Sequence, residues 1–312
     1  MTKYIWGHSR RYNDYSSYIR NHFGKRVQKI SVSGGFTCPN RDGLKGRGGC
    51  TFCNNESFIP GYSEPTLPVK EQIQNGIDFF KEKYPEMEYL AYFQSYTNTY
   101  DEISKLKKLY EEALSHPKVI GLIIGTRPDC ISVQLIKYFA ELKERTYLVI
   151  EIGIESTNEK TLEIINRGHT YKEAEEMIIK LASHNITVGS HMILGLPGES
   201  DNDMLEHAER LSALPIDFLK LHQLQYVKGS QLGRDYLKNP TNFKVWKVDE
   251  YIDLVVKFIE IISPNIVLER FASETPKHLQ IAPKWGLKNF ELVSKIEREL
   301  KNRDTYQGKL FS

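Results

Sequence analysis

The chain has 312 residues, of which 40% are hydrophobic, 11% aromatic and 26% charged, and this composition excludes fibrous and intrinsically disordered proteins. Its 42 lysine and arginine residues nearly balance 40 aspartate and glutamate residues, so the net charge of +2 favours no class of partner. No stretch reaches the roughly 20 apolar residues that span a bilayer, and the first residues lack the apolar core of a signal peptide. We therefore expect a cytoplasmic protein without a membrane partner.

Residues 1–27 form a leader that mixes aromatic with cationic side chains, a combination that can stack on bases and contact phosphates. Arg10 and Arg11 are its first candidates for RNA contact.

Six strands alternate with helices after the leader. The apolar runs that predict strands cover 28–33, 88–93, 118–124, 146–154, 186–194 and 217–226. The amphipathic segments that predict helices cover 69–84, 101–115, 131–144, 171–184 and 201–213. The tail holds a helix over 246–263, a short strand near 265–270 and a helix near 288–301.

Buried strands separated by helices indicate parallel β/α units. The fold class we predict is α/β, a partial (β/α)6 TIM-like barrel over residues 28–235, with a C-terminal elaboration over 236–312 packed on it. In such barrels the active site lies on the loops that follow the strands.

Three of the four cysteines, Cys38, Cys50 and Cys53, fall in the long loop after the first strand. Three thiolates can hold a 4Fe-4S cluster with one iron left open for a substrate or cofactor. The alternative is a structural zinc site completed by a fourth ligand such as His8, His22 or Cys130. The spacing alone leaves both readings open.

The segment CPNRDGLKGRGGCTFC resembles the radical S-adenosylmethionine (SAM) proteins of the Elp3-like type, which space their cysteines more widely than the common Cys-x3-Cys-x2-Cys motif. Phe52 matches the aromatic residue usual between the last two cysteines. Further motifs follow in the family's order, namely TRPDC, EIGIES, INRGHT, HMILGLPGES and KLHQLQYVKGSQL. The sequence lacks the acetyltransferase domain of Elp3, so it is similar to a short, stand-alone bacterial branch.

The resemblance implies that Cys38, Cys50 and Cys53 hold a 4Fe-4S cluster that cleaves SAM to a 5′-deoxyadenosyl radical. It implies a set of further residues near the cofactor, which are Phe52, Gln94, Ser95, Asn98, Glu155, Arg167, Gly195 and His222. The 94–99 segment departs from the Gly-Gly-Glu-like turn that usually holds the SAM amino group. Which of its side chains takes that role stays open.

The same resemblance implies tRNA as the partner and the C5 substituent of wobble uridine as the substrate, with carboxymethylaminomethyl converted to aminomethyl. It also implies an electron donor such as flavodoxin or ferredoxin. Two alternatives stay open: a radical SAM enzyme acting on a peptide or small metabolite, and a zinc-stabilised RNA-binding module without turnover.

Overall fold

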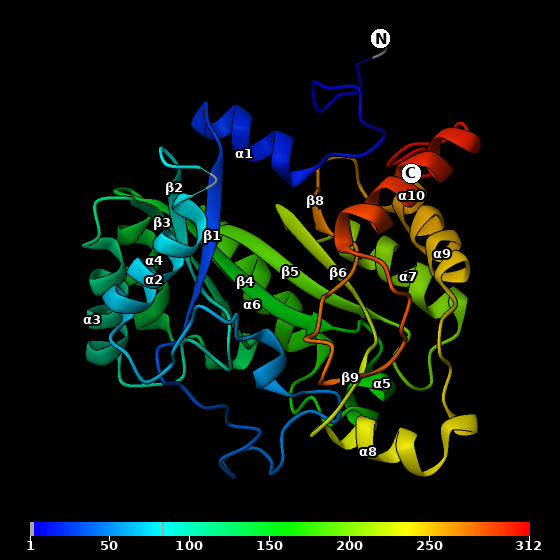
Figure 1. The fold of residues 1–312 in the computed structure, drawn as a ribbon, viewed down its shortest axis with the longest axis horizontal. Helices are drawn as coiled ribbons and strands as arrows, with labels where there is room; N and C mark the ends of the chain where they lie inside the picture. Colours follow the sequence, from blue (N-terminus) through cyan, green and yellow to red (C-terminus); the bar gives the residue numbers. More distant parts are fainter. Residues whose placement is uncertain (1–2, 83) are drawn as a thin grey trace.

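The computed structural model describes residues 3–82 and 84–312 and contains one curved sheet of seven parallel strands (Figure 1). Their order is β1-β2-β3-β4-β5-β6-β8. In that order the strands cover Val27–Val32, Glu88–Phe93, Val119–Thr126, Tyr147–Glu155, Thr187–Leu194, Phe218–Gln223 and Val267–Arg270. This arrangement confirms the predicted α/β partial barrel. The tail strand joins the sheet beside β6, so the barrel has seven strands where we expected six.

Helices from the crossover connections cover the outer face of the sheet, because each carries an apolar stripe that it must bury. They are α2 (Val69–Lys81), α3 (Ile103–Leu114), α4 (Val133–Leu142), α6 (Tyr171–Ser183) and α7 (Asp201–Ser212), with the short α5 (Glu159–Ile164) before α6. Thr170 and Ser200 form capping boxes at the starts of α6 and α7. These helices lie within a few residues of the predicted ones.

The predicted strand 217–226 is two strands in the structure. β6 ends at Gln223, and β7 (Tyr226–Val227) pairs antiparallel with β9 (Gln280–Ala282). The remaining helices of the tail are α8 (Gln231–Lys238), α9 (Val248–Ile261) and α10 (Asn289–Asn302), with short 3-10 turns η1 (Asn55–Phe58), η2 (Pro128–Cys130) and η3 (Pro240–Asn242) elsewhere. Among the described residues, no helix is long and apolar enough to cross a bilayer.

The leader packs on the edge of the barrel. Its residues form α1 (Tyr15–Phe23), a helix that the sequence analysis did not predict, and the Asp14 carboxylate caps this helix at the Ser17 N–H. Asp14 also pairs with Leu268 on the edge of β8. The leader therefore covers a strand edge that would otherwise be open.

Arg10 and Arg11, the leader's candidates for RNA contact, have partners within the chain. Arg10 forms ion pairs with Asp14 at 3.0 Å and Glu297 at 3.3 Å. Arg11 donates to Asp304 at 2.9 Å and to the carbonyl of Thr305 at 3.0 Å. Both cations fasten the leader to the end of α10.

The two edges of the sheet, β1 and β8, face each other across a seam. In the described part of the chain these strands share no backbone pairing, so the barrel is open along this side. Lys29 of β1 reaches Glu269 of β8 at 2.6 Å and links the edges by an ion pair.

Candidate active site

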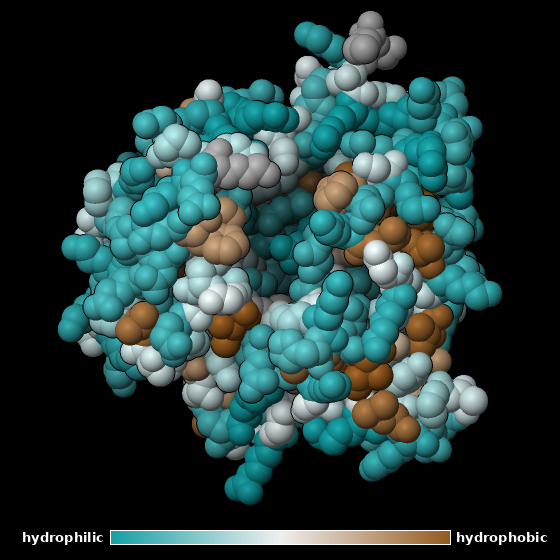
Figure 2. Space-filling model, in the orientation of Figure 1, coloured by the Kyte–Doolittle hydropathy of each residue, from teal (hydrophilic) through white to brown (hydrophobic). Residues whose placement is uncertain are grey.

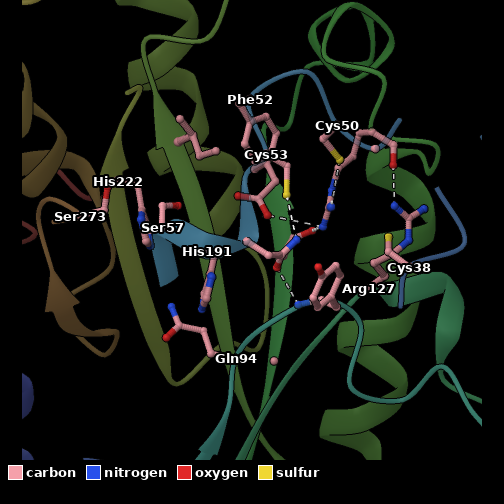
Figure 3. Close-up of a pocket in the computed structure, with 18 of the residues that line it drawn as sticks. Cys38, Cys50, Phe52, Cys53, Ser57, Gln94, Arg127, His191, His222 and Ser273 are labelled. Carbon is pink, nitrogen blue, oxygen red and sulfur yellow. Dashed lines mark hydrogen bonds and ion pairs between the residues drawn. The ribbon is translucent and has the colours of Figure 1, made fainter. Parts of the chain in front are cut away.

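The cysteine loop, residues 33–68, lies at the carboxyl ends of the strands, below the sheet in Figure 1. Its backbone is fixed from two sides: the Thr51 N–H donates to the Ile165 carbonyl at 2.9 Å, and the Leu232 N–H donates to the Thr51 carbonyl at 2.8 Å. The loop brings Cys38, Cys50 and Cys53 to one pocket, here named the cysteine pocket (Figure 3).

Nitrogen donors surround the sulfur atoms. Arg167 Nη1 lies 3.6 Å and Asn40 Nδ2 lies 3.7 Å from Cys50 Sγ. Asn55 Nδ2 lies 3.4 Å from Cys53 Sγ. Burial raises the pKa of Cys53 to about 12, so an unligated thiol would stay protonated here. A metal deprotonates its thiol ligands, and these donors then stabilise the negative sulfurs.

The three thiols match the ligand set of a 4Fe-4S cluster, which would leave one iron open to a substrate or cofactor. Cys38, Cys50 and Cys53 line one pocket and would hold the cluster there. Within the described residues, no group of three His, Cys, Asp or Glu side chains is placed to hold a single metal ion.

A buried ion pair adjoins Cys50. Arg167 Nη2 lies 3.4 Å from Glu155 Oε1 and 2.5 Å from the carbonyl of Gly153, to which it donates. Burial alone would lower the pKa of Arg167, but Cys50 and Glu155 raise it overall, so the guanidinium is firmly charged. Glu155 has φ of 71°, and the register of β4 against β5 shifts between Gly153 and Glu155. This bulge turns the Glu155 side chain into the cysteine pocket.

The segment after β2 divides its polar residues between the pocket and the interior. Gln94, Tyr96 and Thr97 line the cysteine pocket. Ser95 is buried. Asn98 is fully buried, and its side-chain amide donates to the carbonyls of Phe93 at 3.1 Å and Gly125 at 2.7 Å. Asn98 thus joins β2 to β3, whereas Gln94 faces the site.

Phe52 lines the cysteine pocket, whereas Gly195 packs against the tail of the chain. Phe52 lines the pocket and packs on the apolar cluster that includes Ile165 and Ile193. Gly195 has φ of +94°, and a Cβ there would collide with the indole nitrogen of Trp246. The glycine lets the loop after β5 pack against the tail, and Ile193 and Leu224 supply the apolar wall of the pocket.

An ionic network fills the barrel interior beneath the pocket. Lys220 Nζ lies 2.7 Å and 2.8 Å from the two Glu151 oxygens, and 3.2 Å from Glu269. Lys29 lies 2.6 Å from Glu269 and 3.5 Å from Glu151. Burial would raise the pKa of Glu151, but Lys220 and Lys29 hold it well below its usual range. This network stays ionised because each charge is paired.

Two histidines connect this network to the pocket. His191 Nε2 lies 2.8 Å from Glu151, and the His191 and His222 rings are 5.5 Å apart. His222 is 9% exposed and, among the described residues, its Nε2 has no hydrogen-bond partner. Burial, followed by His191 and Arg270, holds the pKa of His222 well below its usual range, so the ring is neutral. In Figure 3 it lies across the pocket from the cysteines.

Cys130, the alternative zinc ligand, ends the η2 turn. Its thiol lies 3.8 Å from Asp129 Oδ1, and burial raises the pKa of Cys130 to about 12. Arg127 and Lys45 pair with the same Asp129 at 3.0 Å and 2.6 Å.

Several pocket residues did not emerge from the sequence. One wall of the pocket, here named the far wall, consists of two amide side chains, two hydroxyl side chains and one valine, namely Gln223, Gln225, Ser273, Thr275 and Val227. Ser273 and Thr275 belong to the loop after β8, and only the parallel pairing of β8 with β6 brings them to the site. The polar residues Gln223 and Gln225, at the end of the apolar run that predicts a strand over 217–226, are the clue that the sequence offers to this wall.

Comparison with known proteins agrees with this architecture. The model of the radical SAM superfamily matches residues 32–211, and that of the Radical_SAM C-terminal domain matches residues 216–302. YtqA of Bacillus subtilis is 37% identical over 305 residues, covering 97% of this chain and 93% of YtqA. YhcC of Escherichia coli K12 is 32% identical over 297 residues, covering 95% and 94%.

More distant relatives share the core. Elongator complex protein 3 of Schizosaccharomyces pombe is 25% identical over 193 residues, covering 58% of this chain and 32% of that protein. The solved structure of the archaeal Methanocaldococcus infernus Elp3 superposes with a TM-score of 0.68 at 17% identity, covering 90% of this chain and 64% of that one. Streptococcus suis SuiB bound to S-adenosylmethionine gives a TM-score of 0.51 at 12% identity, covering 84% and 54%. These two likenesses show a common fold.

Because the superfamily model spans more than half of the sequence and YtqA and YhcC align over nearly its whole length, the chain belongs to the radical SAM superfamily, whose enzymes use a 4Fe-4S cluster and SAM.

Proposed function

We propose that this radical SAM enzyme modifies tRNA at the C5 substituent of wobble uridine, converting carboxymethylaminomethyl to aminomethyl. Cys38, Cys50 and Cys53 hold the cluster. When bound, the cluster and SAM together supply a 5′-deoxyadenosyl radical that abstracts a hydrogen atom.

The target is the methylene carbon between the substituent's nitrogen and its carboxylate, because both neighbours weaken its C–H bond. Loss of that hydrogen atom, followed by loss of a proton and of one electron that returns to the oxidised electron carrier, leaves an imine. Water hydrolyses the imine, so the two-carbon unit leaves as glyoxylate and the aminomethyl group stays on the uridine.

The cysteine pocket has groups that suit SAM. Arg167 Nε is buried without a hydrogen-bond partner among the described residues, so the guanidinium keeps one donor for a carboxylate. Gln94 offers a side-chain carbonyl to the amino group, and Glu155 can accept from the ribose hydroxyls. Phe52 and Ile193 provide apolar surface for the adenine, and Gly195 lets the loop that follows Ile193 pack against Trp246.

The observation that carries the RNA proposal is the chemistry of the far wall. Gln223 and Gln225 are held against the loop after β8, since each amide nitrogen donates to the Ser273 carbonyl, at 3.2 and 3.3 Å, and the Gln225 oxygen accepts from Thr275 at 2.5 Å. Each amide group has a second N–H, and these two donors, fixed in place, suit the edge of a base. These residues also line a second cavity that opens away from the cysteines, so a base splayed out of an RNA loop has an entry path. The resemblance to Elp3-like proteins supports RNA as the substrate.

We infer two further conditions for activity. The cluster needs an external electron, for which flavodoxin or ferredoxin is suitable. All four cysteines are free thiols, and three lie together at the site, which suits the reducing cytoplasm.

Nucleoside mass spectrometry of tRNA from a deletion strain tests the function. We expect carboxymethylaminomethyluridine to accumulate and aminomethyluridine to disappear. The wild-type gene should restore the product, and a Cys50→Ala gene should not. Unchanged wobble nucleosides would favour a peptide or small metabolite as the substrate, and purified protein with stoichiometric zinc but no iron after anaerobic reconstitution would favour the binding module.

A further inference from the structure

Two more cavities extend the cysteine pocket toward the seam between β1 and β8. The middle cavity shares Ser57, Gln94, Gln223, Gln225, Ser273 and Thr275 with the cysteine pocket. The outer cavity shares Gln94, Arg270 and Glu274 with the middle one. Figure 2 shows a hollow with a hydrophilic floor on this face of the molecule. The three cavities therefore adjoin one another in a row from the cysteines to the seam, and we name this row the seam channel.

Arg270, the last residue of β8, lines the seam channel in both its middle and outer parts. Its side chain is half-buried. Within residues 3–82 and 84–312, no hydrogen bond or ion pair to its guanidinium is found. Its charge nevertheless acts on the interior, since it contributes to the lowered pKa of both His222 and Lys220.

The acidic side chains of the seam channel have partners other than Arg270. Glu151 and Glu269 pair with Lys29 and Lys220 in the interior network, and Asp14 pairs with Arg10 at 3.0 Å. Glu274 and Glu291 accept the backbone N–H groups of Asn289 and Lys288, each at 2.7 Å. Among the described residues, no carboxylate therefore forms an ion pair with Arg270.

A second unpaired group points into the same space. His222 is more than nine-tenths buried, its Nε2 lacks a partner among the described residues, and it lines the inner end of the channel. Leaving a buried polar nitrogen without a hydrogen bond costs free energy, as does removing an unpaired guanidinium from water. A ligand recovers both costs if it brings an anion to Arg270 and a hydrogen-bonding group to His222 Nε2.

We propose that Arg270 binds an anionic group of the substrate, a carboxylate or a phosphate, in the seam channel, while His222 contacts the part of the substrate nearer the cysteines. The proposal deepens the proposed function and rests on it for the source of the anion. In an RNA substrate the anion is either the carboxylate of the carboxymethylaminomethyl group or a phosphodiester beside the splayed base.

The first test needs no RNA. The cluster-loaded protein is treated anaerobically with phenylglyoxal, which modifies arginine, in the presence of N-methylglycine or inorganic phosphate at millimolar concentration. Peptide mass spectrometry then reads each arginine separately. We expect either anion to protect Arg270 and neither to protect Arg298, an exposed arginine of α10 that serves as an internal control. Equal modification of Arg270 with and without both anions would overturn the proposal.

The second test identifies the source of the anion. Binding of two anticodon stem-loop RNAs, one with carboxymethylaminomethyluridine and one with aminomethyluridine, is measured for wild type, Arg270→Gln and Arg298→Gln. If Arg270 binds the carboxylate, Arg270→Gln weakens binding of the first RNA alone by roughly ten- to a hundred-fold. If it binds a phosphate, affinity for both RNAs falls equally and the salt dependence flattens by about 0.7 to 0.9 in slope.

The outcomes separate the two proposals. Protection of Arg270 by N-methylglycine in a wild-type protein that binds neither RNA would remove tRNA as the substrate and keep the anion site. Equal RNA affinity in Arg270→Gln and wild type, without anion protection, would remove the anion site and keep tRNA. A ten-fold loss of SAM affinity in Arg270→Gln would assign the guanidinium to the SAM carboxylate and overturn its role toward the substrate.

Discussion

Arg167 links two parts of the candidate site, because one of its terminal nitrogens lies 3.6 Å from Cys50 Sγ and the other 3.4 Å from Glu155 Oε1. A ligand bound between the cysteines and β4 would therefore contact this guanidinium.

Replacing Arg167 by alanine leaves Glu155 unpaired and removes the donor toward a carboxylate. We expect Arg167→Ala to retain iron and to weaken SAM binding roughly ten- to a hundred-fold, measured by equilibrium binding to the reconstituted enzyme. Unchanged SAM affinity would contradict the assignment.

A substitution at Gly153 should displace the Arg167–Glu155 ion pair without removing either side chain. A Cβ at this position would come within 2.6 Å of both Arg167 Nη2 and Glu155 Oε1. These atoms are the ends of side chains, so Gly153→Ala should move the pair and leave the fold intact. We expect weaker SAM binding with a near-normal melting temperature. Gly61→Ala is the matched control, because a Cβ there meets nothing within 4 Å.

The four cysteines should differ in their effect on cluster assembly. Alanine at Cys38, Cys50 or Cys53 should abolish assembly of the oxygen-sensitive cluster, whereas Cys130→Ala should retain it. Iron and acid-labile sulfide, assayed after anaerobic reconstitution, report the result. Loss of the cluster from Cys130→Ala would show that the fourth cysteine is a ligand.

Gln94 and Asn98 provide a similar contrast between binding and stability. Asn98→Ala removes two hydrogen bonds to backbone carbonyls that are fully buried, so we expect a loss of about 1 to 3 kcal/mol in the free energy of unfolding. Gln94→Ala should leave stability unchanged and weaken SAM binding. Denaturant titration and SAM binding, measured on both variants, distinguish the two roles.

The interior network predicts a dependence of stability on pH. The folded-state pKa of Glu151 lies well below its unfolded value of about 4.3, so its stabilising effect is complete above that pH and is lost as the pH falls toward the folded value. Glu151→Gln should cost about 3 to 5 kcal/mol at neutral pH, because it leaves Lys220 underpaired. It should also flatten the acid branch of the stability curve. The double variant Glu151→Gln/Lys220→Met should recover part of the loss, and no recovery would mean that the pair is not the source.

The fold could be predicted from the sequence wherever the apolar residues of a segment followed the spacing of either a helix or a strand. The strands of the core and helices α2, α3, α4, α6 and α7 carry long apolar patterns, so their positions follow within a few residues. Helix α1 escaped prediction because its stripe is weak, with only Ile19 buried, and its stability comes from contact with the barrel. The break between β6 and β7 escaped because apolar residues keep recurring at every second or third position through Tyr226 while the pairing partner changes.

The lining of the pocket could be predicted in part, mostly from residues that match family motifs, although Gln94 lies in a segment that departs from the family's pattern. Cys38, Cys50, Phe52, Cys53, Gln94, Glu155, Arg167 and His222 all line the cysteine pocket. Asn98 and Gly195 have local structural partners in Gly125 and Trp246, which motif matching could not distinguish from ligands. Ser273 and Thr275 depend on the tertiary pairing of β8, and no local signal marks them.

The anchoring of the leader has a consequence for the order in which the protein folds during synthesis. Residues near the start of the chain bind residues from its last part: the Leu268 N–H donates to the Asn13 carbonyl at 2.8 Å, and the Gln307 N–H donates to the Arg11 carbonyl at 2.8 Å. Until β8 has been translated, the edge of β6 is unpaired, and until Gln307 has been translated the leader lacks its bonds to the end of the chain. A nascent core with an unpaired strand edge is prone to aggregation. Chaperone dependence during translation should therefore exceed what the stability of the finished barrel suggests.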